Sequence, residues 1–249
     1  MSWIVRGLRG GILTTHYPHG PEEMPAQWRG VAKALAGARA QEYQLGAAAC
    51  LSGAIVAQAD EAHVLQERCF QCGACARVAP RAFGMSNDYE LALVGADPST
   101  TQDRLARRAA SLGRSIMIRH VDAGSDFATD QEVQALFNPF YDINRLGIFL
   151  TATPRHADLL VVTGVVTHHM VESLKRTYAA MPDPKIVVAV GTAAASGSFY
   201  AADDVYGPVD RVVPVDVKVP GGPPAPLSIL HALWVALGRT AARARETEA

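Results

Sequence analysis

Apolar positions form two contrasting patterns along this chain. In the second half, short runs rich in Val and Ile are apolar almost throughout, which is typical of strands buried on both faces of a parallel sheet. We expect such strands at residues 115–121, 147–152, 158–164, 185–191 and 211–219. Stretches of helical length and composition occur at 168–180 and 227–243. This alternation predicts an α/β domain with a parallel sheet covered by helices on both faces.

The first half has no such alternation. Residues 37–95 are rich in small side chains and hold every cysteine, whereas residues 101–112 carry arginines among alanines and have helical character. Residues 1–36 begin with a short apolar stretch interrupted by arginines and glycines. We expect this segment to be a docking arm that rests on a membrane surface, contacts a partner or packs on its own protein.

These differences divide the chain into four parts. We predict a docking arm at 1–36, a small cysteine-bearing domain at 37–98, a connector helix at 99–112 and the α/β domain at 113–249. A chain of 249 residues is long enough for one sizeable core and a smaller module.

Composition and charge exclude several classes of function. The formal net charge is −1, so the chain lacks the overall positive field that gathers nucleic acid. No apolar run is long enough to cross a bilayer, and the N-terminus lacks the order of a secretory signal. We therefore expect a cytoplasmic location, where four cysteines, three of them crowded together, favour metal ligation over disulfides.

Three of the cysteines follow a recognisable spacing. Cys69, Cys72 and Cys75 form a C-x2-C-x2-C run that continues to Ala79-Pro80. This run resembles the C-x2-C-x2-C-x3-C-P run of bacterial ferredoxins, except that Ala79 replaces the last cysteine. Two-residue spacing lets one tight loop direct three thiolates towards three corners of a cubic cluster, so a fourth ligand must come from elsewhere.

Cys50 is the candidate for that fourth ligand. In two-cluster ferredoxins the last cysteine of each run ligates the other cluster, and Cys50 lies in a segment similar to the end of an upstream copy. The same spacing places Ala40, Tyr43 and Gly46 where the first three cysteines of that copy would be. One of the two cluster sites has thus lost the cysteines at all four of its ligand positions, the fourth of which is now Ala79. The other site keeps all four cysteines. We predict a small α+β ferredoxin-like domain with one [4Fe–4S] cluster on Cys50, Cys69, Cys72 and Cys75.

Two alternatives remain open at this point. Cys50 is an ordinary buried thiol in the first, and the other three cysteines then hold a three-iron cluster or nothing. In the second, the cysteines bind zinc, whose sites often pair C-x2-C units but seldom use this run.

The second half contains several sequence blocks in a fixed order. They are Val121-Asp122-Ala123-Gly124, Tyr141-Asp142-Ile143-Asn144-Arg145-Leu146-Gly147-Ile148, Pro154-Arg155-His156-Ala157-Asp158, Met181-Pro182-Asp183-Pro184-Lys185 and Val213-Pro214-Val215-Asp216. With them the chain from His120 onward resembles the 20-kilodalton subunit of respiratory complex I and the small subunit of group 4 membrane-bound [NiFe] hydrogenases. The resemblance implies a flavodoxin-like parallel sheet whose strand-end loops face a large catalytic subunit.

The same resemblance implies a second cluster that this chain has lost. The family carries four cysteines in these loops, and the corresponding positions here are Asp126, Thr129, Ala193 and Gly222. Because three of these four positions offer no comparable donor, we expect no cluster in this domain. Nearby carboxylates Asp126, Asp130 and Glu132 are expected to be solvated, although a new hard-metal or proton-handling site is the alternative.

Two functions follow from these expectations. In the first, the chain is an iron–sulfur electron-transfer subunit of a membrane-associated hydrogenase-like or complex I-like oxidoreductase, and it is not catalytic alone. Its partners are then a large subunit and membrane-arm subunits, and it lies peripherally on the cytoplasmic face of the inner membrane. In the alternative, the chain is a structural or assembly subunit of such a complex, and the cluster staples its fold.

Overall fold

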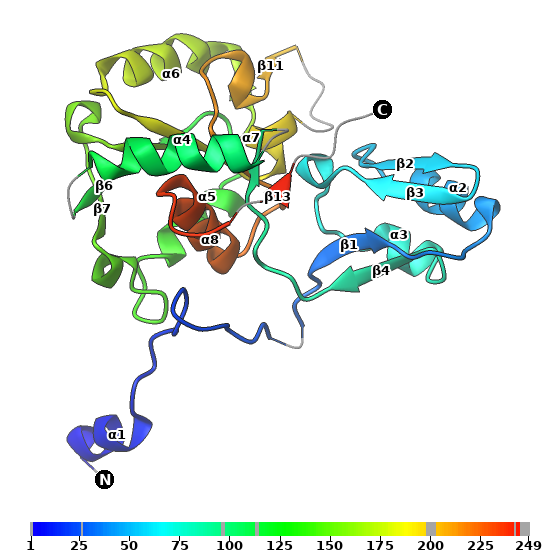
Figure 1. Cartoon of the computed structure of the whole chain (residues 1–249), viewed down its shortest axis with the longest axis horizontal. Coiled ribbons are helices and arrows are strands. Elements are labelled where there is room, and N and C mark those ends of the chain that lie inside the picture. The colour runs from blue at the N-terminus through cyan, green and yellow to red at the C-terminus, as the bar shows by residue number, and fades with distance from the viewer. Residues whose placement is uncertain are drawn as a thin grey trace.

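The computed structural model describes residues 2–25, 27–95, 98–112, 115–197, 203–241 and 243–244. Figure 1 shows a larger α/β domain beside a smaller unit, with an N-terminal helix that extends away from both. Among the described residues, no helix combines the length and the apolar character needed to cross a membrane.

The larger domain is built on a sheet in the order β13-β5-β12-β10-β8-β6-β7. Its strands are β5 (Leu93–Val94), β6 (Ile116–Asp122), β7 (Ile148–Leu150), β8 (Leu159–Thr163), β10 (Ile186–Val190), β12 (Val217–Val219) and β13 (Arg243–Ala244). The strands from β7 to β12 are parallel, and β5 pairs antiparallel with β12. Counted along the chain from β6, the parallel strands have the order 2-1-3-4-5, which is the flavodoxin-like order. The predicted α/β fold is therefore confirmed.

Helices cover both faces of this sheet. They are α4 (Pro98–Ala110), α5 (Ala128–Ala135), α6 (His168–Ala180), α7 (Thr192–Ser196) and α8 (Pro226–Ala236). Successive strand residues point to opposite faces. Leu159 and Val161 accordingly pack in one core with α8, while Leu160 and Val162 pack in another with Leu174 of α6.

Two predicted elements are shorter than expected. Residues 211–219 form a strand only from Val217, because Pro214 has no N–H for the sheet and Val209–Arg211 form a 3-10 turn. The helix predicted to reach residue 243 ends at Ala236. Gly238 follows it with φ +65°, and a Cβ there would lie 2.5 Å from the Cα of Ala106 in α4. The chain thus turns where α8 meets α4.

The smaller unit has the order strand, helix, hairpin, helix, strand. Its elements are β1 (Val31–Ala34), α2 (Ala40–Ala48), β2 (Ile55–Gln58), β3 (Glu61–Val64), α3 (Ala74–Val78) and β4 (Phe83–Ser86). β1 pairs antiparallel with β4, and β2 with β3. Tyr43, Val64 and Phe83 lie in one small core, together with Cys69 and Cys75.

Strand pairing crosses two boundaries suggested by the sequence. β1 lies in the segment expected to be the arm but pairs with β4, and β5 lies at the end of the expected cysteine-bearing domain but pairs with β12. The expected connector helix, α4, packs on α8. We therefore propose that the smaller unit comprises residues 31–86, with its flanking segments packed on the α/β domain.

The N-terminal arm has two distinct parts. Helix α1 (Trp3–Gly10) contains no buried residue and extends away from both units (Figure 1). The following segment lies on the α/β domain, where one guanidinium nitrogen of Arg145 donates to the carbonyls of Thr15 and Tyr17 at 2.7 Å each. Only this second part packs on its own protein.

Candidate metal centre

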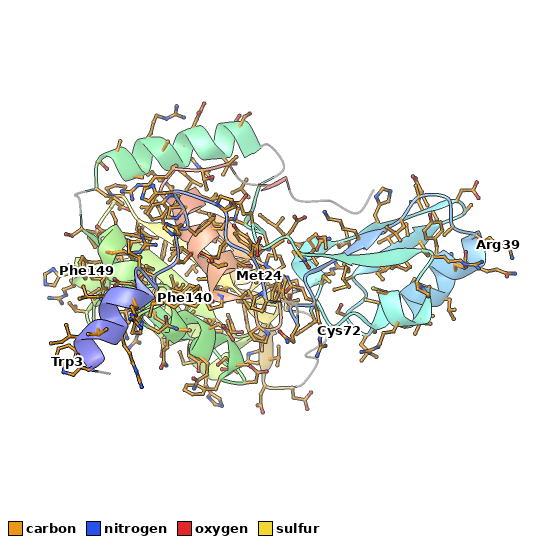
Figure 2. The ribbon with its side chains drawn as sticks, turned by 90° about the horizontal axis from the view of Figure 1, so that it is seen from below. Trp3, Met24, Arg39, Cys72, Phe140 and Phe149 are labelled. Atoms are coloured by element: carbon orange, nitrogen blue, oxygen red, sulfur yellow. The ribbon has the colours of Figure 1, made fainter. Side chains whose placement is uncertain are left out.

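All four cysteines line one cavity of about 760 Å³. Cys50 follows α2, Cys69 and Cys72 lie in the loop before α3, and Cys75 lies in the first turn of α3. The four thiols are free: Cys69 and Cys75 are buried, Cys50 is half-buried and Cys72 is exposed. In Figure 2, Cys72 lies where the smaller unit meets the α/β domain, whereas Arg39 marks the opposite end of that unit.

The conformation of the cysteine loop gathers the thiols on one side. Gln71 and Gly73 both have left-handed backbone conformations, with φ of 59° and 72°. Such a φ is uncommon for a residue other than glycine, and it turns the chain sharply between the ligand positions. The backbone N–H of Gln71 also donates to the sulfur of Cys69 at 3.4 Å. The loop therefore provides both the thiol and a hydrogen bond that stabilises its charged form.

Burial makes the inner thiols poor nucleophiles by themselves. It raises the pKa of Cys69 to about 11, although the N–H of Gln71 acts in the opposite direction, and burial likewise raises the pKa of Cys75. A buried thiol becomes a thiolate most readily when a bound metal supplies positive charge. These sulfurs thus suit metal ligation better than nucleophilic chemistry.

The donor set and the cavity fit an iron–sulfur cluster. In the described part of the chain, no three His, Cys, Asp or Glu side chains converge on the position of a single metal ion. The four cysteines instead line one cavity, and a [4Fe–4S] cluster takes four cysteine thiolates. Trp28 also lines this cavity, and its buried indole N–H has no hydrogen-bond partner among the residues that the structure describes. A cluster would offer it sulfur acceptors.

Most of the positions where the ferredoxin pattern would place the other four cysteines contribute to the packing of the smaller unit. Tyr43 is buried and its hydroxyl donates to the carbonyl of Leu35. Gly46 faces the ring of Phe83 so closely that a Cβ would lie 2.1 Å from it. Ala79 is buried in the same core, and Ala40 begins α2 on the surface. Positions 43, 46 and 79 therefore belong to the packed core of the smaller unit.

In the α/β domain, the four loop positions that correspond to the family's cysteines do not act as ligand positions of this kind. Asp126 is exposed and accepts from the N–H of Ala128 at the start of α5. Thr129 is buried against Gly191, and Ala193 lies in α7. Gly222 lies under the ring of Phe70 from the smaller unit. None of these four side chains supplies a thiolate or imidazole donor.

One expectation about the nearby carboxylates was wrong. Asp130 is not solvated but buried, because its two oxygens are held by the hydroxyls of Ser125 and Thr163. The imidazole of His120 lies 3.1 Å from the same carboxylate. Glu132 is half-buried and lines the cysteine cavity, and burial raises the pKa of its carboxyl.

The contribution of the α/β domain to this cavity was not predicted from the sequence. Glu132, Tyr141, Gly222 and Pro223 line it together with the cysteines. The hydroxyl of Thr192 donates to the carbonyl of Cys69 at 2.9 Å. These residues lie more than 50 positions from the nearest cysteine in the chain, so no local spacing signals the contact.

Comparisons with known proteins agree with this architecture. A family described as NADH ubiquinone oxidoreductase, 20 Kd subunit, matches residues 128–236. The probable membrane-bound hydrogenase subunit mbhJ of Pyrococcus furiosus is 45% identical over 141 residues, which are 56% of this chain and 84% of that protein. The chain belongs to the 20-kilodalton subunit family. The resemblance seen in the sequence is thereby confirmed.

Other members of the 20-kilodalton subunit family are also similar. Formate hydrogenlyase subunit 7 of Escherichia coli is 38% identical over 146 residues, 57% of each chain. An NADH-quinone oxidoreductase subunit of Bdellovibrio bacteriovorus is 42% identical over 103 residues, which are 41% of this chain and 55% of that protein.

A second family covers the cysteine run. Residues 64–112 match the 4Fe-4S single cluster domain of Ferredoxin I. The matched range includes Cys69, Cys72 and Cys75, and Cys50 lies before it. This family member therefore carries an iron–sulfur domain before its α/β domain.

Proposed function

We propose that this chain is the electron-transferring iron–sulfur subunit of a membrane-associated hydrogenase-like or complex I-like oxidoreductase. It carries one [4Fe–4S] cluster, with Cys50, Cys69, Cys72 and Cys75 as its ligands. The observation that carries the proposal is that these four thiols line one cavity in a member of the 20-kilodalton subunit family. When bound, the cluster accepts and returns one electron, and the chain's own residues hold and shield it.

Exposure at the cavity favours electron transfer over a purely structural cluster. Cys72 is exposed while Cys69 and Cys75 are buried, so one side of the site reaches the surface. A cluster that only staples a fold needs no such access. An electron donor or acceptor, by contrast, must approach the cluster closely, and the Cys72 side provides the route.

The partners in this proposal are a large catalytic subunit and membrane-arm subunits. The relatives support it, because their names place them in a membrane-bound hydrogenase, a formate hydrogenlyase and an NADH-quinone oxidoreductase. The chain itself contributes no catalytic residue and works within the assembly. It lies peripherally on the cytoplasmic face of the inner membrane.

Helix α1 is the candidate contact with that membrane. Trp3 and Leu8 are 82% and 81% exposed, and Ile4 lies one turn from Leu8 on the same side of the helix. Arg6 and Arg9, three residues apart, share another side. No acidic residue occurs before Glu22, so the helix combines an apolar side with a basic one, as interfacial helices do.

Metal content and paramagnetism test the proposed function. We expect about four iron and four sulfide per chain in anaerobically purified protein, and a single paramagnetic species after reduction with dithionite. Reoxidation of that species by an artificial acceptor would show that the cluster exchanges electrons through the surface. About eight irons, or two interacting signals, would contradict a single cluster, and absence of iron would overturn the function.

A further inference from the structure

The cysteine loop of the smaller unit rests in two loops of the α/β domain. One follows β10 and begins α7, and the other follows β12. The hydroxyl of Thr192 donates to the carbonyl of Cys69 at 2.9 Å. The side-chain amide of Gln71 donates to the carbonyl of Pro220 at 3.4 Å. Both contacts join the loop that carries the ligands to the carboxyl edge of the parallel sheet.

Thr192 links all three of these segments through a single hydroxyl. Its side chain is fully buried, and while its hydroxyl donates to Cys69 it accepts from the N–H of Gly221 at 2.9 Å. The N–H of Thr192 in turn donates to the carbonyl of Gly221 at 2.8 Å. A buried hydroxyl with both its donor and acceptor roles satisfied fixes geometry strongly, because losing either bond leaves a buried polar group unpaired.

Gly222 and Phe70 form the second part of the contact. A Cβ on residue 222 would lie 2.0 Å from Cδ1 and 2.7 Å from Cε1 of Phe70. Glycine is thus required here by the aromatic ring. Position 222 is one where family resemblance places a cysteine of the α/β domain's own cluster, so the ring of the neighbouring unit now fills that place.

The cavity walls show the same arrangement. Glu132 and Tyr141 from the α/β domain line the space that holds the four thiols, as does Pro223 of the loop after β12. The cysteine site is therefore closed from both units.

We propose that the loops after β10 and β12 form a seat for the cysteine loop, in which Thr192 and Gly222 are positioning residues for the cluster. The seat holds the cluster at the strand-end edge, where it exchanges electrons directly with a partner docked on that edge. The seat also influences the cluster's reduction potential. It does so because the hydrogen bond from the Thr192 hydroxyl to the Cys69 carbonyl and the packing of Phe70 against Gly222 fix the ligand loop. This inference rests on the proposed function, since it requires that a cluster binds.

Thr192→Val tests the hydrogen-bonded part of the seat in the full chain. It keeps the shape of the side chain but removes the hydroxyl, so we expect altered g values and a displaced midpoint potential in an anaerobic titration followed by electron paramagnetic resonance. Thr192→Ser retains the hydroxyl and should restore both wild-type values. Thr163→Val is the matched control, because Thr163 is equally buried but its hydroxyl bonds within the α/β domain.

Gly222→Ala tests the packed part independently. It should displace Phe70 and reduce iron content or change the spectrum, and Phe70→Leu in the same chain should restore iron and spectrum towards wild type by making room for the new methyl group. If Thr192→Val cannot be purified, Gly222→Ala with and without Phe70→Leu tests the proposed seat by itself. Wild-type spectra and potentials in both Thr192→Val and Gly222→Ala would overturn the seat while leaving the cluster intact. Wild-type protein without iron would instead overturn the proposed function.

Discussion

The ammonium group of Lys218 lies 3.4 Å from a carboxylate oxygen of Glu67, and this ion pair joins β12 to the turn that precedes Cys69. Lys218 is also 2.6 Å from Asp210, and its side chain is only 5% exposed. A buried cation held by two carboxylates is stabilising only while its partners remain. The pair therefore adds an electrostatic contact to the region where the two units meet.

Replacing this lysine should weaken the whole fold. We expect Lys218→Met to lower the free energy of unfolding by about 1–3 kcal/mol, because two partly buried carboxylates lose their shared cation. Urea denaturation followed by circular dichroism measures the change. Lys33→Met is the matched control, since Lys33 and Asp88 form an exposed pair whose loss should lower the free energy by no more than about 1 kcal/mol. Equal effects would contradict a special role for Lys218.

Cys50 should be as necessary for the cluster as Cys72. Because both thiols line the same cavity, Cys50→Ala and Cys72→Ala should each lower iron content well below that of wild type. Iron analysis and the visible absorption of the oxidised protein provide the measurement.

Ser52→Ala separates ligation from packing at this site. The hydroxyl of Ser52 lies 3.5 Å from the sulfur of Cys50, so this variant changes the surroundings of Cys50 while leaving its thiol in place. It should keep wild-type iron content. If Cys50→Ala also kept its iron and spectrum, Cys50 would be an ordinary thiol and the fourth ligand would have to be found elsewhere.

Much of the fold follows from the sequence because its signals are local. The runs that form β8 and β10 are apolar throughout, and all five residues of each strand are buried. Helix α6 has the predicted bounds of 168–180. The strand and helix ends that differ from the prediction depend on tertiary contacts instead, as at Gly238, where the approach of Ala106 decides where α8 stops.

The site was predictable only where its residues are close in sequence. The run Cys69-x2-Cys72-x2-Cys75 is recognisable by its spacing, and Cys50 is proposed as the fourth ligand through its place in a degenerate copy of the same run. Thr192 and Gly222 belong to another domain, and nothing in their local sequence indicates a contact with the cysteine loop. Asp130 was expected to be solvated because a helix-start carboxylate usually is, whereas Thr163 and His120 are brought to it only by the folded sheet.

Acid should destabilise this protein through His120. Burial lowers the pKa of its imidazole and outweighs the opposite effects of Asp130 and Asp122, while Arg119 also lowers the pKa. A histidine with a lowered pKa in the folded state stabilises the fold above the unfolded pKa of about 6.5. This contribution is lost as the pH falls through the folded pKa, because the unfolded chain binds the proton more readily.

His120→Gln should remove this dependence. As the pH falls below about 6.5 towards the lowered folded pKa, the wild-type free energy of unfolding should decrease by up to about 1.4 kcal/mol per pH unit, and the variant should give a flatter profile. Urea denaturation across this range measures it. His63→Gln serves as the control, because it makes the same substitution at a histidine whose side chain is exposed. A wild-type profile that rises towards acid would reverse the assigned direction of the pKa shift.

Helix α1 should bind the full chain to anionic lipid. Each basic residue near an anionic surface contributes about 1 kcal/mol, so Arg6→Gln and Arg9→Gln together should weaken binding roughly 30-fold. Trp3→Ala should also weaken it by removing apolar contact. Co-sedimentation with vesicles of phosphatidylcholine and phosphatidylglycerol measures binding, and vesicles of phosphatidylcholine alone show how much depends on charge. Arg176→Gln, an exposed change on α6, should bind as wild type does. If the α1 variants bind equally well, this helix contacts a protein partner rather than the membrane.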